Sequence, residues 1–341
     1  MSDEAIKAAA NPLSTPSPEG RRGARGGAPR SRAGTRPARG GAPRLITPAR
    51  ARELAALLDR FERTFDKRGR VGFDPVELPR RYRHPADQEV AGLFSAALAY
   101  GRADVFKAQL ERVLGEMGPS PAAFCERFAA SPKARAFEGF RYRFNRPEDM
   151  AALAAAVGEV RARHGSLGAR FSALLREEAG GAEPLRMALA RFARELREAP
   201  TALAALGTRG GRGLAHLLPD ARLSGACKRW NLYLRWMVRG PDEVDLGVWP
   251  EVPRSALVVP LDTHLARIAR NLALTDREDM SWRTAEEITA NLRQLDPRDP
   301  VRFDFALCHL GMSGACPARQ ERERCRVCQL RTACRARLGS Q

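Results

Sequence analysis

The hydrophobic positions along most of the chain follow the period of an amphipathic α-helix. Leu54, Leu57, Leu58 and Phe61 fall at i, i+3, i+4 and i+7, which places them on one helix face. The same period predicts further helices over residues 87–100, 106–117, 147–163, 168–178, 183–197 and 211–218. Alternation typical of a strand is confined to the short, isolated stretch 140–144. The pattern therefore predicts an all-α fold.

The first 45 residues lack this period. They are rich in Gly, Pro, Ala, Ser and Arg, which predicts a disordered basic tail over residues 1–45. Residues 1–50 hold nine Arg and one Lys against three acids, a net of +7 out of +18 for the whole chain. The remaining +11 belongs to the body, so a polyanionic partner is expected, either nucleic acid or an acidic membrane surface. The tail itself either keeps the protein soluble or attracts phosphate.

The chain carries no recognisable signal for export. It opens with acidic residues and has no apolar signal-peptide core, and no stretch reaches the roughly 18 apolar residues of a membrane span. Seven cysteines, five of them after residue 300, do not resemble the framework of a secreted disulfide protein. A cytoplasmic location is expected, where clustered cysteines indicate metal ligands.

Residues 224–238 are predicted to form a helix with two distinct faces. Its apolar stripe is Ala226, Trp230, Tyr233, Leu234 and Met237, and its polar face is Lys228, Asn231, Arg235 and Arg239. A polar face beside a heavily buried apolar face is typical of a helix at the wall of a cleft. Lys228 stands out because only five of the 58 basic residues are Lys. A desolvated amine can lose its proton and attack carbon, which a guanidinium cannot. Lys228 is therefore either a nucleophile or an ordinary surface lysine.

Asp262 stands where the N-cap of the next helix belongs. The apolar face of that helix is Leu261, Leu265, Ile268 and Leu272. Asp is a favoured cap whatever the function, but helix-end N–H groups also keep a carboxylate ionised. Asp262 could thus serve as a general base or stabilise developing positive charge. Arg267 and Arg270 on the same helix either contact phosphates or form a solvated basic face.

Four cysteines near the end of the chain have the spacing of metal ligands. Cys316, Cys325, Cys328 and Cys334 have eight, two and five residues between them. A Cys-x2-Cys turn can aim two thiolates at one metal centre. Zinc and a [4Fe–4S] cluster both take four cysteines, and spacing alone does not choose between them. Cys308 has the wrong distance for this set and is predicted to be a small core residue.

These motifs together resemble the helix-hairpin-helix (HhH-GPD) DNA glycosylase superfamily, in particular its iron–sulfur branch typified by endonuclease III. The Lys-x-x-Asn motif of that family matches Lys228–Asn231, and its Asp-Thr-His-x-x-Arg motif matches Asp262–Arg267. In the cysteine loop only the first gap differs. The resemblance covers about residues 46–335 and is strongest to a bacterial branch with Cys-Lys-Arg-x-Asn and Leu-Asp-Thr-His motifs.

The sequence departs from that family at three places. The hairpin Leu-Pro-Gly-Val-Gly corresponds to residues 218–225, where Gly225 is the glycine that remains. Lys228 and Asp262 are 34 positions apart, more than in the family, and the added segment with Trp249 is expected to form a loop over the cleft. The family Gln that fills the gap left by a flipped base is Ala97 here. Tyr100 or Arg102 is expected to replace it.

The resemblance implies an organisation and a function. Residues 86–240 would form a helical barrel, residues 46–85 and 255–335 a second helical domain with the metal loop, and residues 241–254 an insertion. The implied activity is a DNA glycosylase, with AP lyase activity through a Schiff base on Lys228 assisted by Asp262. The DNA contacts would be Gly225, Asn231, Arg235, Arg267, Arg270, Tyr100 and Arg102.

The same resemblance implies a [4Fe–4S] cluster on the four cysteines, with zinc as the alternative. The partner would be duplex DNA carrying damage, bound by a monomer in the nucleoid of the cytoplasm. The alternative is a non-catalytic DNA-binding protein, or one directed to RNA, that keeps the glycosylase fold.

Overall fold

The protein is helical throughout the part that the structure describes. The computed structural model describes residues 42–223 and 225–336, and it contains no β-strand within these ranges. The stretch 140–144 forms only an isolated bridge between Tyr142 and Asn145, with Arg143 in the left-handed region at φ +54°. The all-α prediction is confirmed. The predicted basic tail lies, up to residue 41, outside the described residues.

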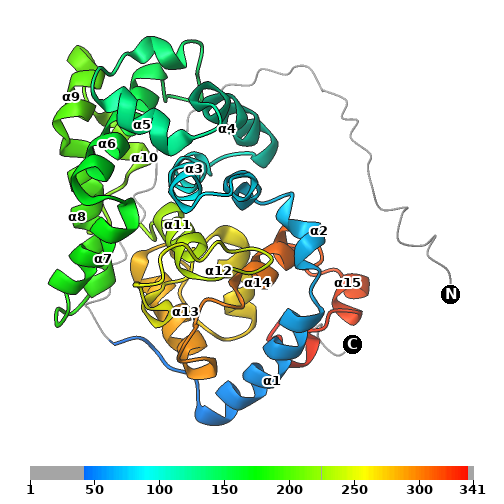
Figure 1. Ribbon diagram of the computed structural model, residues 1–341. Helices are drawn as coiled ribbons and strands as arrows, with labels where there is room; N and C mark the ends of the chain where they lie inside the picture. The colour runs from blue at the N-terminus through cyan, green and yellow to red at the C-terminus, as the bar shows by residue number, and fades with distance from the viewer. Residues whose placement is uncertain (1–41, 224, 337–341) are drawn as a thin grey trace, which may run out of the picture. The chain divides into compact units, whose positions relative to one another are not determined.

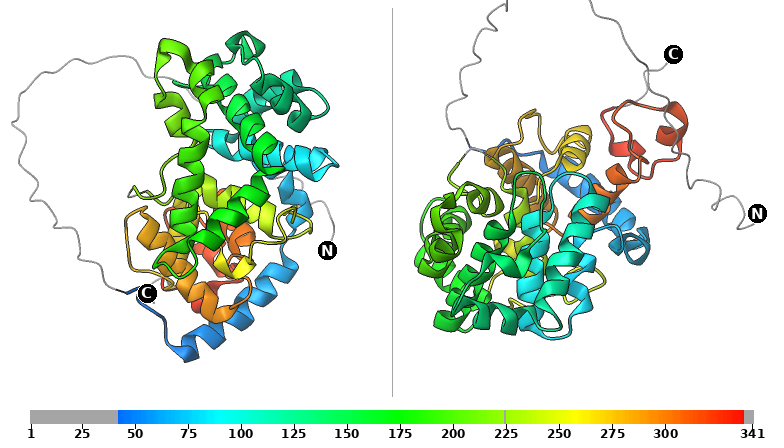
Figure 2. Two further views of the ribbon diagram at one scale, coloured as in Figure 1. Left: turned by 60° about the vertical axis from the view of Figure 1, so that its left-hand side comes forward. Right: turned by 90° about the horizontal axis from the view of Figure 1, so that it is seen from above.

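The helices follow one another along the chain, and the longest connection, residues 239–262, joins α11 to α12 (Figures 1 and 2). In chain order the α-helices are α1 (Pro48–Thr64), α2 (Lys67–Val71), α3 (Pro85–Leu98), α4 (Ala103–Met117), α5 (Pro121–Ala129), α6 (Pro147–His164), α7 (Leu167–Glu177), α8 (Pro184–Glu198), α9 (Pro200–Leu206), α10 (Arg212–Leu217), α11 (Lys228–Val238), α12 (Thr263–Asn271), α13 (Trp282–Leu295), α14 (Asp304–Met312) and α15 (Arg322–Arg326). Short 3-10 helices are η3 (Pro75–Glu77), η4 (Pro79–Arg81), η5 (Ala134–Phe137), η6 (Gly207–Arg209), η7 (Arg254–Ala256) and η8 (Arg331–Ala333). None of the described helices is long and apolar enough to cross a bilayer.

Most of these helices start where local chemistry favours a start. Thr47 caps α1 by accepting the Arg50 N–H, and proline occupies the first turn of α1, α3, α5, α6, α8 and α9. The sequence period did not predict α13. Its buried face mixes Trp282 and Ile288 with polar Glu287 and Asn291, which pair with Thr275 and with the backbone of Ile46. A polar buried face weakens the hydrophobic period.

Two helix pairs position the functional site. Helix α3 packs on α11, because Gly92 leaves room for the Tyr233 and Met237 side chains. Helix α12 packs on α14, where Gly311 lies against His264. All of these helices belong to one unit that begins at Pro43. The division into two helical domains stays a prediction.

Helix α6 is the centre of a separate, alanine-rich packing region. It contacts α5, α7, α8 and α9, and residues 149–161 are buried along its length. Gly158 allows the close approach of α5, because a Cβ there would press on the Cys125 carbonyl and lie 2.9 Å from the Ala129 Cβ.

We expect Gly158→Ala to destabilise the protein by about 1–3 kcal/mol, because the added methyl group overpacks the α5–α6 contact. The matched control is Gly115→Ala in α4, where an added Cβ meets nothing within 4 Å. The control should be neutral or stabilising by up to about 1 kcal/mol, through helix propensity alone. Chemical denaturation midpoints measure both, and equal shifts would contradict the packing argument.

Candidate functional site

Helix α11 begins later than its sequence period predicts, and this start places Lys228 at the first helical position. Cys227 precedes it in the left-handed region, at φ +48°, which prevents the helix from extending back toward residue 224. The Asn231 side chain donates to the Ala226 carbonyl at 3.1 Å and fixes this turn. Arg229 donates to the Ala97 carbonyl at 2.6 Å and so ties the turn to the end of α3.

The Asp262 carboxylate meets Lys228 despite their separation of 34 residues. Asp262 is the N-cap of α12, as predicted, and its Oδ1 accepts the Leu265 N–H at 2.8 Å. Its Oδ2 lies 3.3 Å from Lys228 Nζ. The cap bond holds the carboxylate in place, so one oxygen serves the helix and the other faces the lysine.

Both side chains line a cleft of about 520 Å³, within the usual range for a small-ligand site. Its wall contains polar residues and several aromatic rings. The lining residues are Phe73, Asp74, Pro75, Ala99, Tyr100, Gly101, Phe106, Lys228, Arg229, Leu232, Arg235, Pro260, Leu261, Asp262, Thr263, His264, Met280, Asp304, Phe305, Cys308, His309 and Met312. The wall therefore draws on α3, α4, α11, α12 and α14.

The lysine and the carboxylate hold each other in the charged state. Burial alone would lower the pKa of Lys228, but the nearby acidic groups, above all Asp262, together outweigh burial and raise the pKa above its ordinary value. Burial alone would raise the pKa of Asp262, but Lys228 and the Leu265 N–H lower it. The Lys228 side chain keeps 38% of its surface exposed toward the cleft. A nucleophilic lysine here would have to give up its proton before it attacks.

Cys308 belongs to this site, and the prediction that it is only a core residue is wrong. Its Sγ donates to Asp262 Oδ2 at 3.3 Å. Burial raises the pKa of the Cys308 thiol well above its ordinary range, so it stays a neutral donor. Asp304, Cys308 and Met312 are four residues apart on α14 and all line the cleft. That i, i+4, i+8 spacing was the signal in the sequence.

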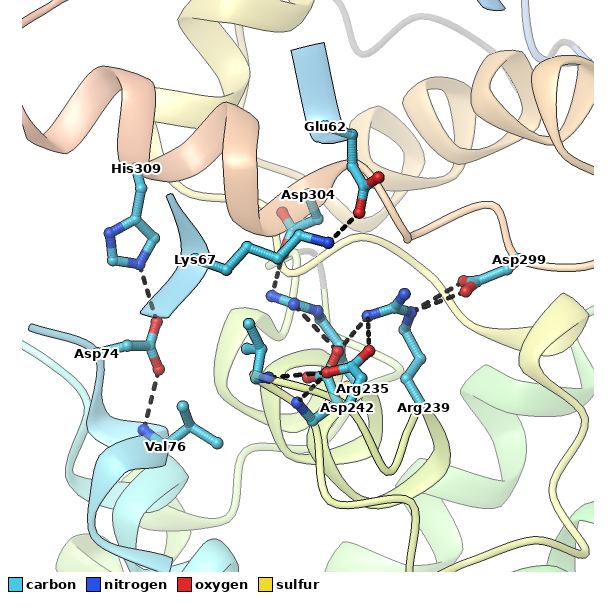
Figure 3. A network of polar contacts seen from close by, with 12 residues as sticks. Glu62, Lys67, Asp74, Val76, Arg235, Arg239, Asp242, Asp299, Asp304 and His309 are labelled. Atoms are coloured by element: carbon cyan, nitrogen blue, oxygen red, sulfur yellow. Dashed lines mark hydrogen bonds and ion pairs between the residues drawn. The ribbon is translucent and has the colours of Figure 1, made fainter. Parts of the chain in front are cut away.

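The predicted DNA contacts Asn231 and Arg235 are wrong, because both side chains are buried. Arg235 is 2% exposed and donates to Asp304 Oδ2 at 2.9 Å and to Asp245 Oδ2 at 3.2 Å (Figure 3). A buried guanidinium paired with two carboxylates is not available to a phosphate. The polar face of the helix is an internal ion-pair face instead.

The insertion 241–254 is the reason for that burial, and the expectation that it covers the cleft is wrong. It supplies Asp245, which is fully buried against Arg235 and Arg239. Its Trp249 stacks on Phe171 at 5.6 Å. None of its residues is among those that line the cleft.

The remaining predicted DNA contacts differ in whether they line the cleft. Tyr100 lines the cleft and donates to Asn145 Oδ1 at 2.5 Å. Arg102 is exposed, pairs with Asp104 at 2.7 Å and is not part of the cleft wall. Gly225 is exposed, with open space where a side chain would lie.

The two arginines on α12 are half-buried and bonded within the protein. Arg267 donates to the Cys316 carbonyl, and Arg270 donates to the Arg277 carbonyl at 3.4 Å. Arg267 thus connects the helix capped by Asp262 to the first cysteine of the metal motif.

All four predicted metal ligands line one cavity of about 560 Å³. Cys316, Cys325, Cys328 and Cys334 are each partly buried. The Cys328 N–H donates to the Cys325 carbonyl at 3.3 Å, which closes the expected Cys-x2-Cys turn. Within residues 42–223 and 225–336, no three His, Cys, Asp or Glu side chains are gathered tightly enough to hold a single metal ion. The thiols surround a shared space.

Comparison with known proteins gives one family match, and the matched range includes most of the cleft. A family model described as "Protein of unknown function (DUF2400)" matches residues 74–313. The matched range contains Lys228, Asp262, Asp304 and Cys308 and ends before Cys316. No curated protein and no solved structure matches the chain.

We expect Asp262→Asn to lower the pKa of Lys228, because burial then acts without the opposing carboxylate. Asn keeps an acceptor for the helix cap, so the change removes mainly charge. Reductive ¹³C-methylation labels the lysine amines, and carbon chemical shifts followed against pH report each pKa. The signal of Lys67, paired with Glu62, is the internal control. An unchanged Lys228 titration would contradict the ion pair.

Proposed function

The chain belongs to the DUF2400 family, and from the geometry of its cleft we propose that it excises damaged bases from duplex DNA as a DNA glycosylase with AP lyase activity. The observation that carries the proposal is the 3.3 Å approach of Lys228 Nζ to Asp262 Oδ2 at the wall of a 520 Å³ cleft. A buried carboxylate beside an accessible lysine is a typical arrangement for amine nucleophiles.

The proposed reaction begins with a damaged nucleotide turned out of the duplex into the cleft. Asp262 accepts the Lys228 proton, or stabilises positive charge on the sugar as the base departs. The Lys228 nitrogen then bonds to C1′ while the glycosidic bond breaks, and the electron pair leaves with the base, which takes up a proton. The nitrogen gives up a further proton, its lone pair forms the C1′=N bond of the Schiff base, and the C1′–O4′ bond breaks with its electron pair and a proton going to O4′. Loss of a C2′ proton from the Schiff base then expels the 3′ phosphate and cleaves the strand by β-elimination.

Three features of the chain support this chemistry. The cleft is lined by the exposed ring of Phe73 and the half-buried ring of Tyr100, which offer a flat apolar surface to a base. The body of the protein carries a net charge of +11, which favours a phosphate backbone. The motifs around Lys228 and Asp262 are similar to those of the helix-hairpin-helix glycosylases, whose two helical domains enclose such a cleft.

We further propose that the four cysteines hold a [4Fe–4S] cluster, with zinc as the alternative. Their thiols share a 560 Å³ cavity, which suits a multi-atom cluster better than one tetrahedral ion. When bound, the cluster would cross-link the loop 316–334 by thiolate ligation. Helix α15 in that loop has no buried residue, so ligation would supply the stability that packing does not.

A DNA-binding protein without catalysis is the second candidate. It is favoured by the positive charge of Lys228 in the absence of a ligand. Asp262 raises the pKa of Lys228, which opposes the effect of burial. Binding to RNA through the same cleft belongs to this second class. Covalent trapping separates it from the enzyme.

We expect borohydride to trap the protein covalently on duplexes that carry an abasic site or a processed lesion, through an imine on Lys228. Lys228→Arg should abolish trapping and lower lesion-dependent cleavage by at least about 10²-fold, because a guanidinium cannot form the imine. Denaturing gels measure the adduct and the cleaved strand together.

The matched control is Lys107→Arg, since Lys107 is a lysine outside the cleft that contacts the Gly72 carbonyl. It should trap as the parent does. Cleavage by Lys228→Arg at the parental rate would refute the Schiff-base role and leave the non-catalytic candidate.

We expect the purified protein to be yellow-brown and to contain iron in addition to acid-labile sulfide. Cys328→Ser should lower the iron content and the soluble yield, because one of four ligands is lost. Cys308→Ser should retain the iron, since its thiol faces Asp262 instead. Elemental analysis and visible absorbance measure both. A colourless protein with one zinc per chain would contradict the iron proposal.

A further inference from the structure

The carboxylate of Asp304 has one oxygen that the described part of the protein does not use. Asp304 is the first residue of α14, is 2% exposed and lines the cleft. Its Oδ2 accepts from Arg235 at 2.9 Å, while its Oδ1 is buried without a hydrogen-bond partner among the described residues. A buried carboxylate oxygen without a donor is costly, so it calls for a partner such as a bound ligand or water.

The charge balance around Asp304 points the same way. Two guanidinium groups, of Arg235 and Arg239, pair with four carboxylates, those of Asp242, Asp245, Asp299 and Asp304 (Figure 3). With all four ionised, this network carries two negative charges in excess. Of its four carboxylates, Asp304 alone lines the cleft. The excess negative charge therefore reaches the cleft at Asp304, where a ligand would bind.

Asp304 is nevertheless an acceptor at neutral pH. Burial raises its pKa to about 6, with Asp262, Asp245 and Asp74 adding to the rise and Arg235 opposing it. None of the nearby donors bonds to this oxygen: Lys228 and Cys308 donate to Asp262, and His309 lies 3.3 Å from Asp74. The Nε of Arg235 likewise has no partner among the described residues. A ligand in the cleft is the donor we consider for Asp304 Oδ1.

We propose that Asp304 is a specificity-determining residue whose Oδ1 accepts an N–H group of the base held in the cleft. The proposal rests on the proposed function and narrows its substrates to bases that carry a ring N–H. Phe73 lies in the same wall, is 62% exposed and gives a planar ring a surface to stack on. A neutral N–H bonded to a carboxylate is a strong, charge-assisted contact in a buried site.

The test measures affinity for duplexes whose single modified nucleotide has a 2′-fluoro sugar, which resists loss of the base. Two matched pairs are compared: dihydrouracil with N3-methyl-dihydrouracil, and hypoxanthine with 1-methylhypoxanthine. A tetrahydrofuran abasic duplex reports binding without a base. The parent should bind at least one N–H base about 10-fold or more tightly than its methylated partner.

In Asp304→Asn, the affinity for the duplex with the preferred N–H base should fall to that for the duplex with its methylated partner. Affinity for the abasic duplex should be unchanged. Asp299→Asn is the matched control, because it weakens the same network through Arg239 but does not line the cleft. It should retain the preference. The parent comparison needs no variant and so does not depend on how well Asp304→Asn folds.

Three results would overturn the inference: a parent without preference for either N–H base, an Asp304→Asn variant that keeps the preference, or equal losses in Asp304→Asn and Asp299→Asn. Failure of the proposed function gives a different result. Borohydride trapping on abasic duplexes involves no base, so absence of trapping together with an intact N–H preference would support the base site and reject the lyase.

Discussion

The buried guanidinium of Arg235 is the interaction on which the site depends. It joins α11 to the insertion through Asp245 and to α14 through Asp304. These bonds set the helix that carries Lys228 against the helix that carries Cys308. A buried charge left without its partner costs several kcal/mol, roughly 3–5. The cleft geometry is therefore maintained by electrostatics in its interior, and the insertion contributes from behind the cleft wall.

The charges that line the cleft balance, although the protein is strongly basic. Asp74, Asp262 and Asp304 line it together with Lys228, Arg229 and Arg235, whereas the chain as a whole has a net charge of +18. The outer charge favours a polyanion, while the balanced charges inside the cleft offer a phosphate no net attraction. This division suits a ligand whose charged backbone stays outside and whose neutral, N–H-bearing part enters.

Helix α12 connects the cleft with the cysteine loop. Asp262 caps its first turn, and Arg267, one turn later, donates to the Cys316 carbonyl. A change in the cysteine loop would therefore reach the helix that holds the carboxylate. The loop has little apolar packing of its own. Metal ligation and the contact with Arg267 would therefore both stabilise its conformation.

The sequence alone determined the local features: the helical class, the Asp262 cap and the cysteine motif. Each depends on residues within a few positions, where helix period, capping and turn geometry act. Only the tertiary structure decided which polar groups meet. Asn231 and Arg235 have the spacing of an exposed face, yet Asp245 and Asp304 bury it. Cys308 is a small residue of a type common in protein cores, yet its thiol donates a hydrogen bond to Asp262. Helical periodicity shows that one face of a helix is polar and the opposite face apolar. The residues that cover the polar face come from another segment of the chain, so the local pattern cannot predict them.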